Sequence, residues 1–277
     1  MQIIGQKYNL DIINSWKEMP NFTIIQGDKN TGKTSLVFYM CEKFGLHYVK
    51  MKNGINDIRQ LIKLMSPNSK TVYHFKDFDK ASIQAKNALL KITEETPVGN
   101  HIVITGSRQI KTLESRARKL TMSSYSLDEI VQYSNKYEKG YEIQRKLYMS
   151  GINTPSKIEK YIKVENLDGL VNLAFDTFSV ITNITLDYCC RTVAQFEGKY
   201  DEVDLVLLYI DMLIHIIEYN IMEKQFYDYY DILNILIMAK ESIERDYTLN
   251  RKFVLYRVLY GISLFSEKPV GVGRWKR

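Results

Sequence analysis

The residues with the clearest chemical meaning form one loop near the N-terminus. Gly27 to Thr34 read GDKNTGKT, which fits the spacing G-x-x-x-x-G-K-[ST] without a mismatch. In such loops backbone N–H groups converge on phosphates, the lysine reaches the terminal phosphates and the Ser/Thr hydroxyl binds Mg²⁺. We therefore predict a site for ATP or ADP with Mg²⁺, with Thr34 on the metal. The predicted nucleotide-binding residues are Gly27, Asp28, Lys29, Asn30, Thr31, Gly32, Lys33, Thr34 and Ser35.

A loop of this kind needs a strand before it and a helix after it. Phe22–Gln26 is a short apolar run typical of a buried strand, and Ser35–Phe44 has helical spacing. Val72–Phe75 and Ile102–Thr105 are two further strand-like runs, each followed by helical spacing or turn residues. This order predicts a parallel sheet flanked by helices over residues 1–122.

The second half of the chain has a different pattern. Beyond Ser126 the strand signal disappears, and helical periodicity recurs over Gly169–Phe196, Glu202–Met222, Phe226–Glu244 and Asn250–Phe265. The serine-rich turn at Ser123–Asp128 marks the boundary, with a possible helix N-cap, and Asn153–Lys157 marks a second break. The predicted fold class is α/β plus all-α, ending in a flexible basic tail at 266–277.

Several function classes are disfavoured by composition. Asp211, His215 and Glu218 interrupt the apolar segment Val206–Met222, so we expect a buried or amphipathic helix there and no membrane contact. Nothing at the start resembles an export signal, so the cytoplasm is the expected compartment. Three cysteines without metal-ligand spacing favour neither zinc nor a disulfide. His74 and His101 lie in apolar runs, and we interpret them as core residues without chemistry.

Positive charge is concentrated in the first half. Residues 1–125 hold 19 lysines and arginines against 10 acidic residues, a net charge of +9, and the remainder carries −3. Such asymmetry favours a polyanion partner, either nucleic acid or nucleotide, although a solvated lysine-rich surface gives the same pattern.

A second motif makes the sequence recognisable. Ser82–Pro97, SIQAKNALLKITEETP, follows the acidic strand end Lys76–Lys80 and resembles the clamp-loader branch of the AAA+ ATPases. The resemblance continues at Ile3–Gln6, which is similar to the family's adenine-side segment, and at Ser115-Arg116-Ala117, which is similar to its S-R-C motif. It implies a AAA+ sheet domain at 1–122, a helical lid at 123–168 and a helical collar at 169–265.

The resemblance also implies roles for individual residues. Ile4, Gly5 and Thr105 would join the nucleotide site, since Ile102–Ser107 falls where the family places its sensor strand. Arg116 would act in trans, as an arginine finger on ATP bound by a neighbouring subunit. Without this context, Arg116 would be interpreted as an ordinary surface arginine in a basic cluster.

The hydrolytic centre departs from the family pattern. Aligned without a gap, Lys76 stands where active members have the Mg²⁺-associated aspartate, and Asp77 stands where they have the catalytic glutamate. A lysine there repels Mg²⁺, so we expect weak or no hydrolysis, with Asp77 as the tentative catalytic acid. A one-residue slip would make Asp77 the metal-side acid and would leave Phe78 at the water-orienting position. Either alignment leaves the site incomplete.

This combination looks most like the delta-prime subunit of the bacterial clamp loader, part of the DNA polymerase III holoenzyme. The departures are the absence of a four-cysteine zinc module between the phosphate loop and the second strand, and Ala117 in place of the S-R-C cysteine. The richness in Lys, Ile, Asn and Tyr suits an AT-rich genome, such as that of a phage, in which case the compartment is the host cytoplasm.

The resemblance implies three kinds of partner: other clamp-loader subunits in a hetero-oligomeric ring, a sliding clamp and primer-template DNA. The lysines expected to contribute to DNA contact along phosphates are Lys80, Lys86, Lys91 and Lys111. Two other functions stay open from the residues alone. One is an active clamp-loader ATPase like the gamma subunit or the small subunits of replication factor C, and the other is a nucleotide-gated AAA+ protein outside replication.

Overall fold

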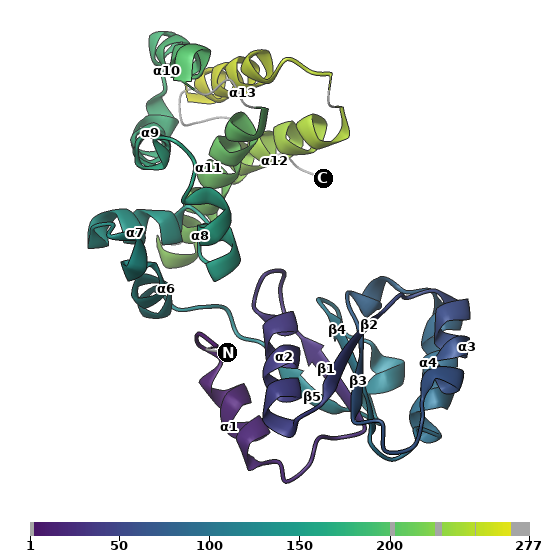
Figure 1. Cartoon of the computed structure of the whole chain (residues 1–277). Coiled ribbons are helices and arrows are strands. Elements are labelled where there is room, and N and C mark those ends of the chain that lie inside the picture. The colour runs from purple at the N-terminus through teal and green to yellow at the C-terminus, as the bar shows by residue number, and fades with distance from the viewer. Residues whose placement is uncertain (1–2, 200–202, 225–228, 247, 267–277) are drawn as a thin grey trace. The chain divides into compact units, whose positions relative to one another are not determined.

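The computed structural model of the chain describes residues 3–199, 203–224, 229–246 and 248–266. The chain divides into two compact units, Met1–Glu129 and Ile130–Arg277 (Figure 1). The first unit is α/β and the described part of the second is helical, so the predicted fold class is confirmed. The finer division into lid and collar at 168/169 stays a prediction, and the predicted tail beyond Ser266 lies outside the described residues.

The elements of the first unit alternate between strands and helices. In chain order they are α1 (Lys7–Ser15), β1 (Phe22–Gln26), α2 (Lys33–Phe44), β2 (His47–Met51), α3 (Ile55–Leu64), β3 (Thr71–Phe75), the 3₁₀ turn η1 (Phe78–Lys80), α4 (Ile83–Glu94), β4 (Asn100–Gly106), α5 (Lys111–Glu114) and β5 (Arg118–Thr121).

The strands form one parallel sheet in the order β2-β3-β4-β1-β5. Strand β1 lies between β4 and β5, with Ile25 opposite Thr105 and Leu120. Strands β1, β3 and β4 are buried along their whole length, which explains their continuous apolar sequences. The carboxyl ends of the strands meet at one edge of the sheet, where the phosphate loop begins.

Each face of the sheet carries its own core. Helices α1 and α2 cover one face, where Ile13, Leu36 and Met40 pack against Ile25 and Val103. The opposite face is covered by α3, α4 and α5, whose buried side chains pack against the other residues of the same strands. The unit is therefore a three-layer sandwich, as Figure 1 shows.

Strands β2 and β5 were missed by sequence analysis, and both lie at an edge of the sheet. The side chains of His47, Val49 and Lys50 are exposed in β2, and Leu120 is the one buried residue of β5. An edge strand with one partner and few buried side chains lacks the apolar run that identifies a central strand.

The segment after the sheet contains a helix N-cap at Ser126. The Ser126 hydroxyl accepts a hydrogen bond from the N–H of Glu129 (3.2 Å), and the Glu129 carboxylate accepts one from the N–H of Ser126 (2.9 Å). This reciprocal capping box starts α6 (Leu127–Ser134) and confirms the N-cap expected at Ser123–Asp128.

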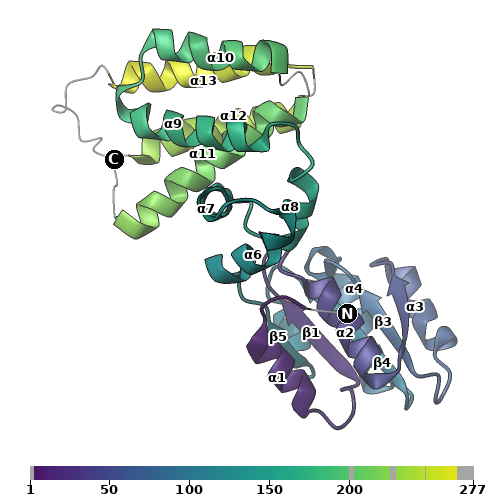
Figure 2. The same ribbon diagram turned by 60° about the vertical axis from the view of Figure 1, so that its left-hand side comes forward.

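The described part of the second unit is helical. After α6 it contains η2 (Asn135–Tyr137), α7 (Tyr141–Met149), α8 (Pro155–Tyr161), α9 (Leu167–Val180), η3 (Ile181–Asn183), α10 (Leu186–Lys199), α11 (Val203–Lys224), α12 (Tyr230–Arg245) and α13 (Arg251–Ser266). Helix α11 packs against α9 and α12, and α10 lies beside α13 (Figure 2).

The helical pattern expected over Gly169–Phe196 is divided in the structure, because α9 and α10 are separate helices. Ile184 has an extended backbone (φ −66°, ψ 129°), and the Thr185 hydroxyl accepts a hydrogen bond from the N–H of Tyr188. Residues that favour helix caps and turns divide this periodic stretch, so apolar spacing alone overestimates the length of the helix. The predicted break at Asn153–Lys157 is confirmed by Thr154, which caps α8 ahead of Pro155.

Helix α11 is the central helix of the second unit. By length and composition alone, Leu205–Met222 is long and apolar enough to cross a membrane. The expectation that Asp211 and Glu218 make this segment too polar for a membrane span is therefore wrong. Within the fold, 61% of this stretch is buried, and Tyr209, Leu213 and Ile217 have no exposed surface. The buried helix that we expected is therefore confirmed on packing rather than on composition.

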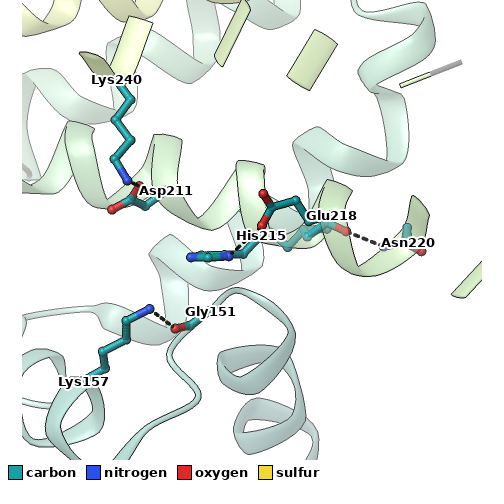
Figure 3. A network of polar contacts seen from close by, with 8 residues as sticks. Gly151, Lys157, Asp211, His215, Glu218, Asn220 and Lys240 are labelled. Carbon is teal, nitrogen blue, oxygen red and sulfur yellow. Dashed lines mark hydrogen bonds and ion pairs between the residues drawn. The ribbon is translucent and has the colours of Figure 1, made fainter. Parts of the chain in front are cut away.

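A polar network joins α11 to its neighbours (Figure 3). The ammonium of Lys240 on α12 lies 2.5 Å from the Asp211 carboxylate, and His215 contacts Glu218 at 3.1 Å. Lys157 on α8 donates to the carbonyl oxygen of Gly151 (2.7 Å) in the loop between α7 and α8. Burial lowers the pKa of Lys157, and the charge of Asp211 acts in the opposite direction.

The Gly151 loop packs directly against α11. Gly151 has φ +84°, and a Cβ atom there would lie 2.0 Å from Cδ2 of His215. We expect Gly151→Ala to destabilise the chain by about 2–4 kcal/mol, because it combines a left-handed backbone with overpacking. Denaturant unfolding of the full chain measures the change.

Gly261→Ala is the matched control. Gly261 lies within α13, and a Cβ there would meet no atom within 4 Å. Alanine at this position is expected to leave stability unchanged or to raise it by up to about 1 kcal/mol. Equal stability of the Gly151→Ala variant and the unmodified chain would contradict the close packing at His215.

Candidate nucleotide-binding site

The phosphate loop follows β1 directly and is fixed on both sides by the sheet. The N–H of Gly27 donates to the carbonyl oxygen of Gly106 at the end of β4 (3.2 Å). The N–H of Met122, just beyond β5, donates to the carbonyl oxygen of Gln26 (2.7 Å). The first residue of the loop is therefore held between the ends of both strands that flank β1.

Two glycines of the loop lie against the segment that follows β5. A Cβ at Gly27 (φ +154°) would lie 2.6 Å from Cβ of Met122, and one at Gly32 (φ +87°) would lie 2.8 Å from the Tyr125 hydroxyl oxygen. Only glycine fits these positions, since each combines an unfavourable φ with a close neighbour. Gly32 is also the N-cap of α2, so the helix N-terminus opens onto the loop.

Lys33 is folded back onto its own loop. Its ammonium donates to the carbonyl oxygens of Gly27 (2.7 Å) and Asp28 (2.5 Å), and the residue is only 9% exposed. Burial lowers the pKa of Lys33, while the charges of Asp77, Asp28 and Asp79 oppose that shift. Thr31 closes the loop by donating to the carbonyl oxygen of Asp28 (2.8 Å).

The donor set of this loop fits a nucleotide phosphate. A glycine backbone, a helix N-terminus and a buried ammonium whose partners are neutral carbonyls are the groups that bind polyphosphate. Asp28, Lys29 and Asn30 are exposed along the loop, and Thr34 and Ser35 are half-buried in the first turn of α2. The Thr34 hydroxyl is the group that would hold Mg²⁺ with the nucleotide.

The end of β3 places basic and acidic groups next to this loop. Strand β3 stops at Phe75, Lys76 is exposed, and Asp77 adopts a left-handed backbone (φ 53°, ψ 40°). Among the charges that act on Lys33, Asp77 has the largest effect and Lys76 opposes it. Asp77 is therefore close enough to Lys33 to act on it, beside a positive charge at position 76, and both alignments stay predictions.

Asp79 turns back toward the sheet. Its Oδ1 atom is buried without a hydrogen-bond partner among the described residues, and it would lie 2.7 Å from a Cβ at Gly106. The Lys86 ammonium donates to the carbonyl oxygen of Asp79 (2.7 Å) and fixes the backbone there. The negative charge of this carboxylate therefore stays close to Lys33.

Thr105 occupies the last position of β4 before Gly106 and is buried. Its hydroxyl lies 3.0 Å from Nε2 of His74 on β3. The ring of His74 is completely buried, and His101 is 8% exposed, so the expectation of core histidines is confirmed.

Ile4 and Gly5 lie in the N-terminal segment, which is bound to the chain just beyond β5. The Gln6 side chain donates to the carbonyl oxygen of Ser123 (2.7 Å), and its Oε1 accepts from the N–H of Ser123 (3.1 Å). Asn9 donates to the carbonyl oxygen of Thr121 (2.9 Å). Ile4 and Gly5 are half-buried next to these contacts.

Arg116 is part of a different group of residues. Its guanidinium lies 2.5 Å from the Glu94 carboxylate at the end of α4, and their side chains are 43% and 51% exposed. Nearby, Gln26 at the end of β1 donates to the Glu114 carboxylate of α5 (3.0 Å). No contact described within residues 3–129 joins Arg116 to the phosphate loop.

The four lysines assigned to DNA contact lie on η1, α4 and α5. Lys80, Lys91 and Lys111 are exposed, whereas Lys86 is half-buried through its bond to Asp79. Lys91 lines an open groove between α3 and α4, together with Ile55, Arg59, Ile62, Gln84, Asn87, Ala88 and Ile92.

Sequence analysis missed three parts of this site. Tyr125 lies against Gly32, His74 binds Thr105, and Gln6 fixes the N-terminal segment. Tyr125 and His74 belong to no motif, and Gln6, the last residue of the segment Ile3–Gln6, had no role of its own assigned. The one available signal was a polar residue inside an apolar strand, which for His74 was interpreted as structural.

Comparisons with known proteins bear on the fold alone. A DNA polymerase III gamma subunit-related protein from Thermotoga maritima has a TM-score of 0.47 and 17% identity, over 95% of this chain and 100% of its own. The RuvB Holliday junction branch migration motor of the same organism has a TM-score of 0.50 and 13% identity, over 93% of this chain and 88% of its own. A point mutant of that RuvB has a TM-score of 0.50 and 14% identity, over 94% of this chain and 89% of its own.

No protein-family model matches the sequence, and neither does any curated protein. The RuvB structures show that this chain shares their fold, an α/β domain followed by helices.

The buried His74 predicts a pH dependence of stability. Burial lowers the pKa of His74 from 6.5 to about 4, so the folded chain keeps this ring neutral. Between these values the unfolded chain binds a proton that the folded chain does not. The free energy of unfolding is therefore unaffected by His74 above pH 6.5. Between pH 6.5 and about pH 4 it falls progressively, by about 3 kcal/mol in total.

His74→Gln supplies the comparison, because glutamine does not titrate and all other groups are shared. Denaturant unfolding from pH 7 to pH 4 should show a steeper loss in the unmodified chain than in this variant. Parallel pH profiles for the two proteins would contradict the low pKa.

Proposed function

We propose that this chain is a subunit of a DNA polymerase sliding-clamp loader, which binds ATP with Mg²⁺, has weak or no hydrolysis of its own and supplies Arg116 to a neighbouring subunit. The observation that carries the proposal is the pair of side chains after β3. Asp77 acts on the phosphate lysine Lys33, while Lys76 places a positive charge where Mg²⁺ needs a carboxylate. Such a site favours binding over turnover.

The exposure of Arg116 supports a role toward another subunit. Its ion pair with Glu94 is half-exposed on both sides, and ion pairs of this kind contribute about 0–1 kcal/mol. Arg116 can therefore leave Glu94 at little cost when a stronger anion is offered. A γ-phosphate on a neighbouring subunit is such an anion, and Glu94 belongs to the same clamp-loader motif on α4.

The proposed partners follow from the same resemblance. The ring would contain other clamp-loader subunits and would act on a sliding clamp and primer-template DNA. The tagged chain, purified from its own cell or from an infected host with ATP present, should retain these proteins. Recovery of no replication protein would instead favour a nucleotide-gated protein outside replication.

Arg116→Ala tests the arginine finger in the purified complex. We expect hydrolysis at the neighbouring site to fall by roughly 10³-fold, the effect typical of a lost finger, while the complex still assembles. ATP turnover and gel filtration measure these two properties separately. Arg118→Ala is the matched control, since Arg118 is also exposed and lies two residues further along the chain. Equal turnover in the Arg116→Ala complex and the unmodified one would exclude the finger.

Lys76→Asp tests the degraded metal site. Replacing the positive charge by a carboxylate should raise Mg²⁺-dependent ATP turnover of the isolated chain by about tenfold, which corresponds to about 1.4 kcal/mol of barrier. Phosphate release at saturating ATP measures it. Lys80→Asp makes the same charge change at an exposed position of η1 and should have little effect.

An active clamp-loader ATPase is the second candidate, because Asp77 has the largest charge effect on Lys33. In that case the unmodified chain already hydrolyses ATP, this activity disappears in Lys33→Ala, and Lys76→Asp adds nothing. The same phosphate-release measurement therefore distinguishes the two candidates.

A further inference from the structure

A buried histidine lies between the edge of the sheet and the phosphate loop. His74 is the fourth residue of β3, and both of its ring nitrogens have a partner. Nδ1 lies 3.0 Å from the hydroxyl oxygen of Tyr48 on β2, and Nε2 lies 3.0 Å from Oγ1 of Thr105 on β4. The three side chains thus form a continuous hydrogen-bonded series across three neighbouring strands.

This series ends beside the phosphate loop. Thr105 alternates along β4 with Ile104 and therefore shares the face of Val103, which α2 covers. The next residue, Gly106, accepts a hydrogen bond from the N–H of Gly27, the first residue of the loop. The Thr105 hydroxyl is therefore at the end of its strand nearest the expected phosphates.

Tyr48 is held at the other end. Its ring lies 4.5 Å from the ring of Phe38 on α2, measured between centroids, and Tyr48 is half-buried. Burial raises the pKa of Tyr48, so its hydroxyl keeps its proton and is available as a donor.

The direction of these hydrogen bonds decides what Thr105 can offer a ligand. A neutral imidazole has one donor and one acceptor nitrogen. When Tyr48 donates to Nδ1, the proton of His74 is on Nε2 and is donated to Thr105 Oγ1. The hydroxyl hydrogen of Thr105 is then available to an anion. In the opposite tautomer, Thr105 donates to Nε2 and turns a lone pair toward the phosphates.

We propose that Tyr48 and His74 are positioning residues that fix Thr105 as a hydrogen-bond donor to the terminal phosphate of a bound nucleoside triphosphate. The inference rests on the proposed nucleotide binding and goes beyond it, because it assigns the distinction between ATP and ADP to a side-chain series outside the motifs. The low pKa of His74, caused by burial, is consistent with it, since a protonated ring could not accept from Tyr48.

The test compares ATP and ADP affinity in four variants of the full chain. Tyr48→Phe removes the donor to Nδ1 and keeps the ring that packs on Phe38. His74→Leu removes both hydrogen bonds, and His74→Gln keeps a side-chain N–H that can reach Thr105. Thr105→Val removes the hydroxyl at nearly constant volume. Fluorescence titration with labelled ATP and ADP gives the dissociation constants, and thermal unfolding checks that each variant folds.

We expect ATP binding to weaken by roughly tenfold in Thr105→Val and His74→Leu, with ADP binding unchanged, because a hydrogen bond to a charged phosphate is lost. Tyr48→Phe should weaken ATP binding less, and His74→Gln should restore part of the His74→Leu loss. Tyr48→Phe should have no further effect on ATP binding in a chain that already carries Thr105→Val, since the series then has no end group.

Each other outcome overturns the inference. Equal losses of ATP and ADP affinity would indicate a general disturbance of the loop, and additive effects of Tyr48→Phe and Thr105→Val would show that the two residues act independently. If ATP affinity is unchanged in folded Tyr48→Phe and His74→Leu chains and Lys33→Ala abolishes binding, the positioning role is excluded and the proposed nucleotide binding stands. If the unmodified chain binds neither nucleotide, or Lys33→Ala binds both normally, the proposed nucleotide binding fails as well.

Discussion

The parallel pairing of β1 between β4 and β5 is the constraint on which the site depends. Because all strands run in one direction, their carboxyl ends gather at one edge, where the phosphate loop follows β1 and meets the ends of β4 and β5. Gly106 and Met122 hold the loop through backbone hydrogen bonds, and β3 brings the acidic groups. Strand pairing that buries all of β1 therefore sets the path of the loop, and glycine is the residue that fits this path at Gly27 and Gly32.

Electrostatics at this edge is the basis for the proposed difference between nucleotide binding and turnover. Lys33 is buried, neutral carbonyls accept its hydrogen bonds, and nearby carboxylates favour its protonated form against the effect of burial on its pKa. Lys76 also acts on Lys33, and in the proposed alignment it adds positive charge where a metal ion would need a carboxylate. Nucleotide phosphate carries negative charge and gains from both lysines, whereas Mg²⁺ loses from the second. The side chain of Lys76 would thus favour phosphate binding over Mg²⁺ binding without any change in the backbone of the site.

The sequence was sufficient for the features that are local. The phosphate loop, the three central strands and the helical second half follow from spacing and periodicity, since these residues interact with near neighbours or are buried on both sides. Strands β2 and β5 could not be found this way, because pairing with a distant strand makes them strands although their own side chains are exposed. The pairing of Tyr48 with His74 depends on which strands become neighbours, so no local pattern contains it. The break between α9 and α10 was hidden by continuous apolar spacing.

The contact between Gly151 and His215 also limits how the sequence can diverge. The imidazole fills the volume that a side chain at position 151 would need, so position 151 must stay glycine while His215 is kept. Relatives that carry a larger residue in the loop should carry a small one on the helix, and the pair should vary together across an alignment. Such covariation would show that the contact between the loop and α11 is kept among relatives, even where overall sequence identity is too low to align the helices.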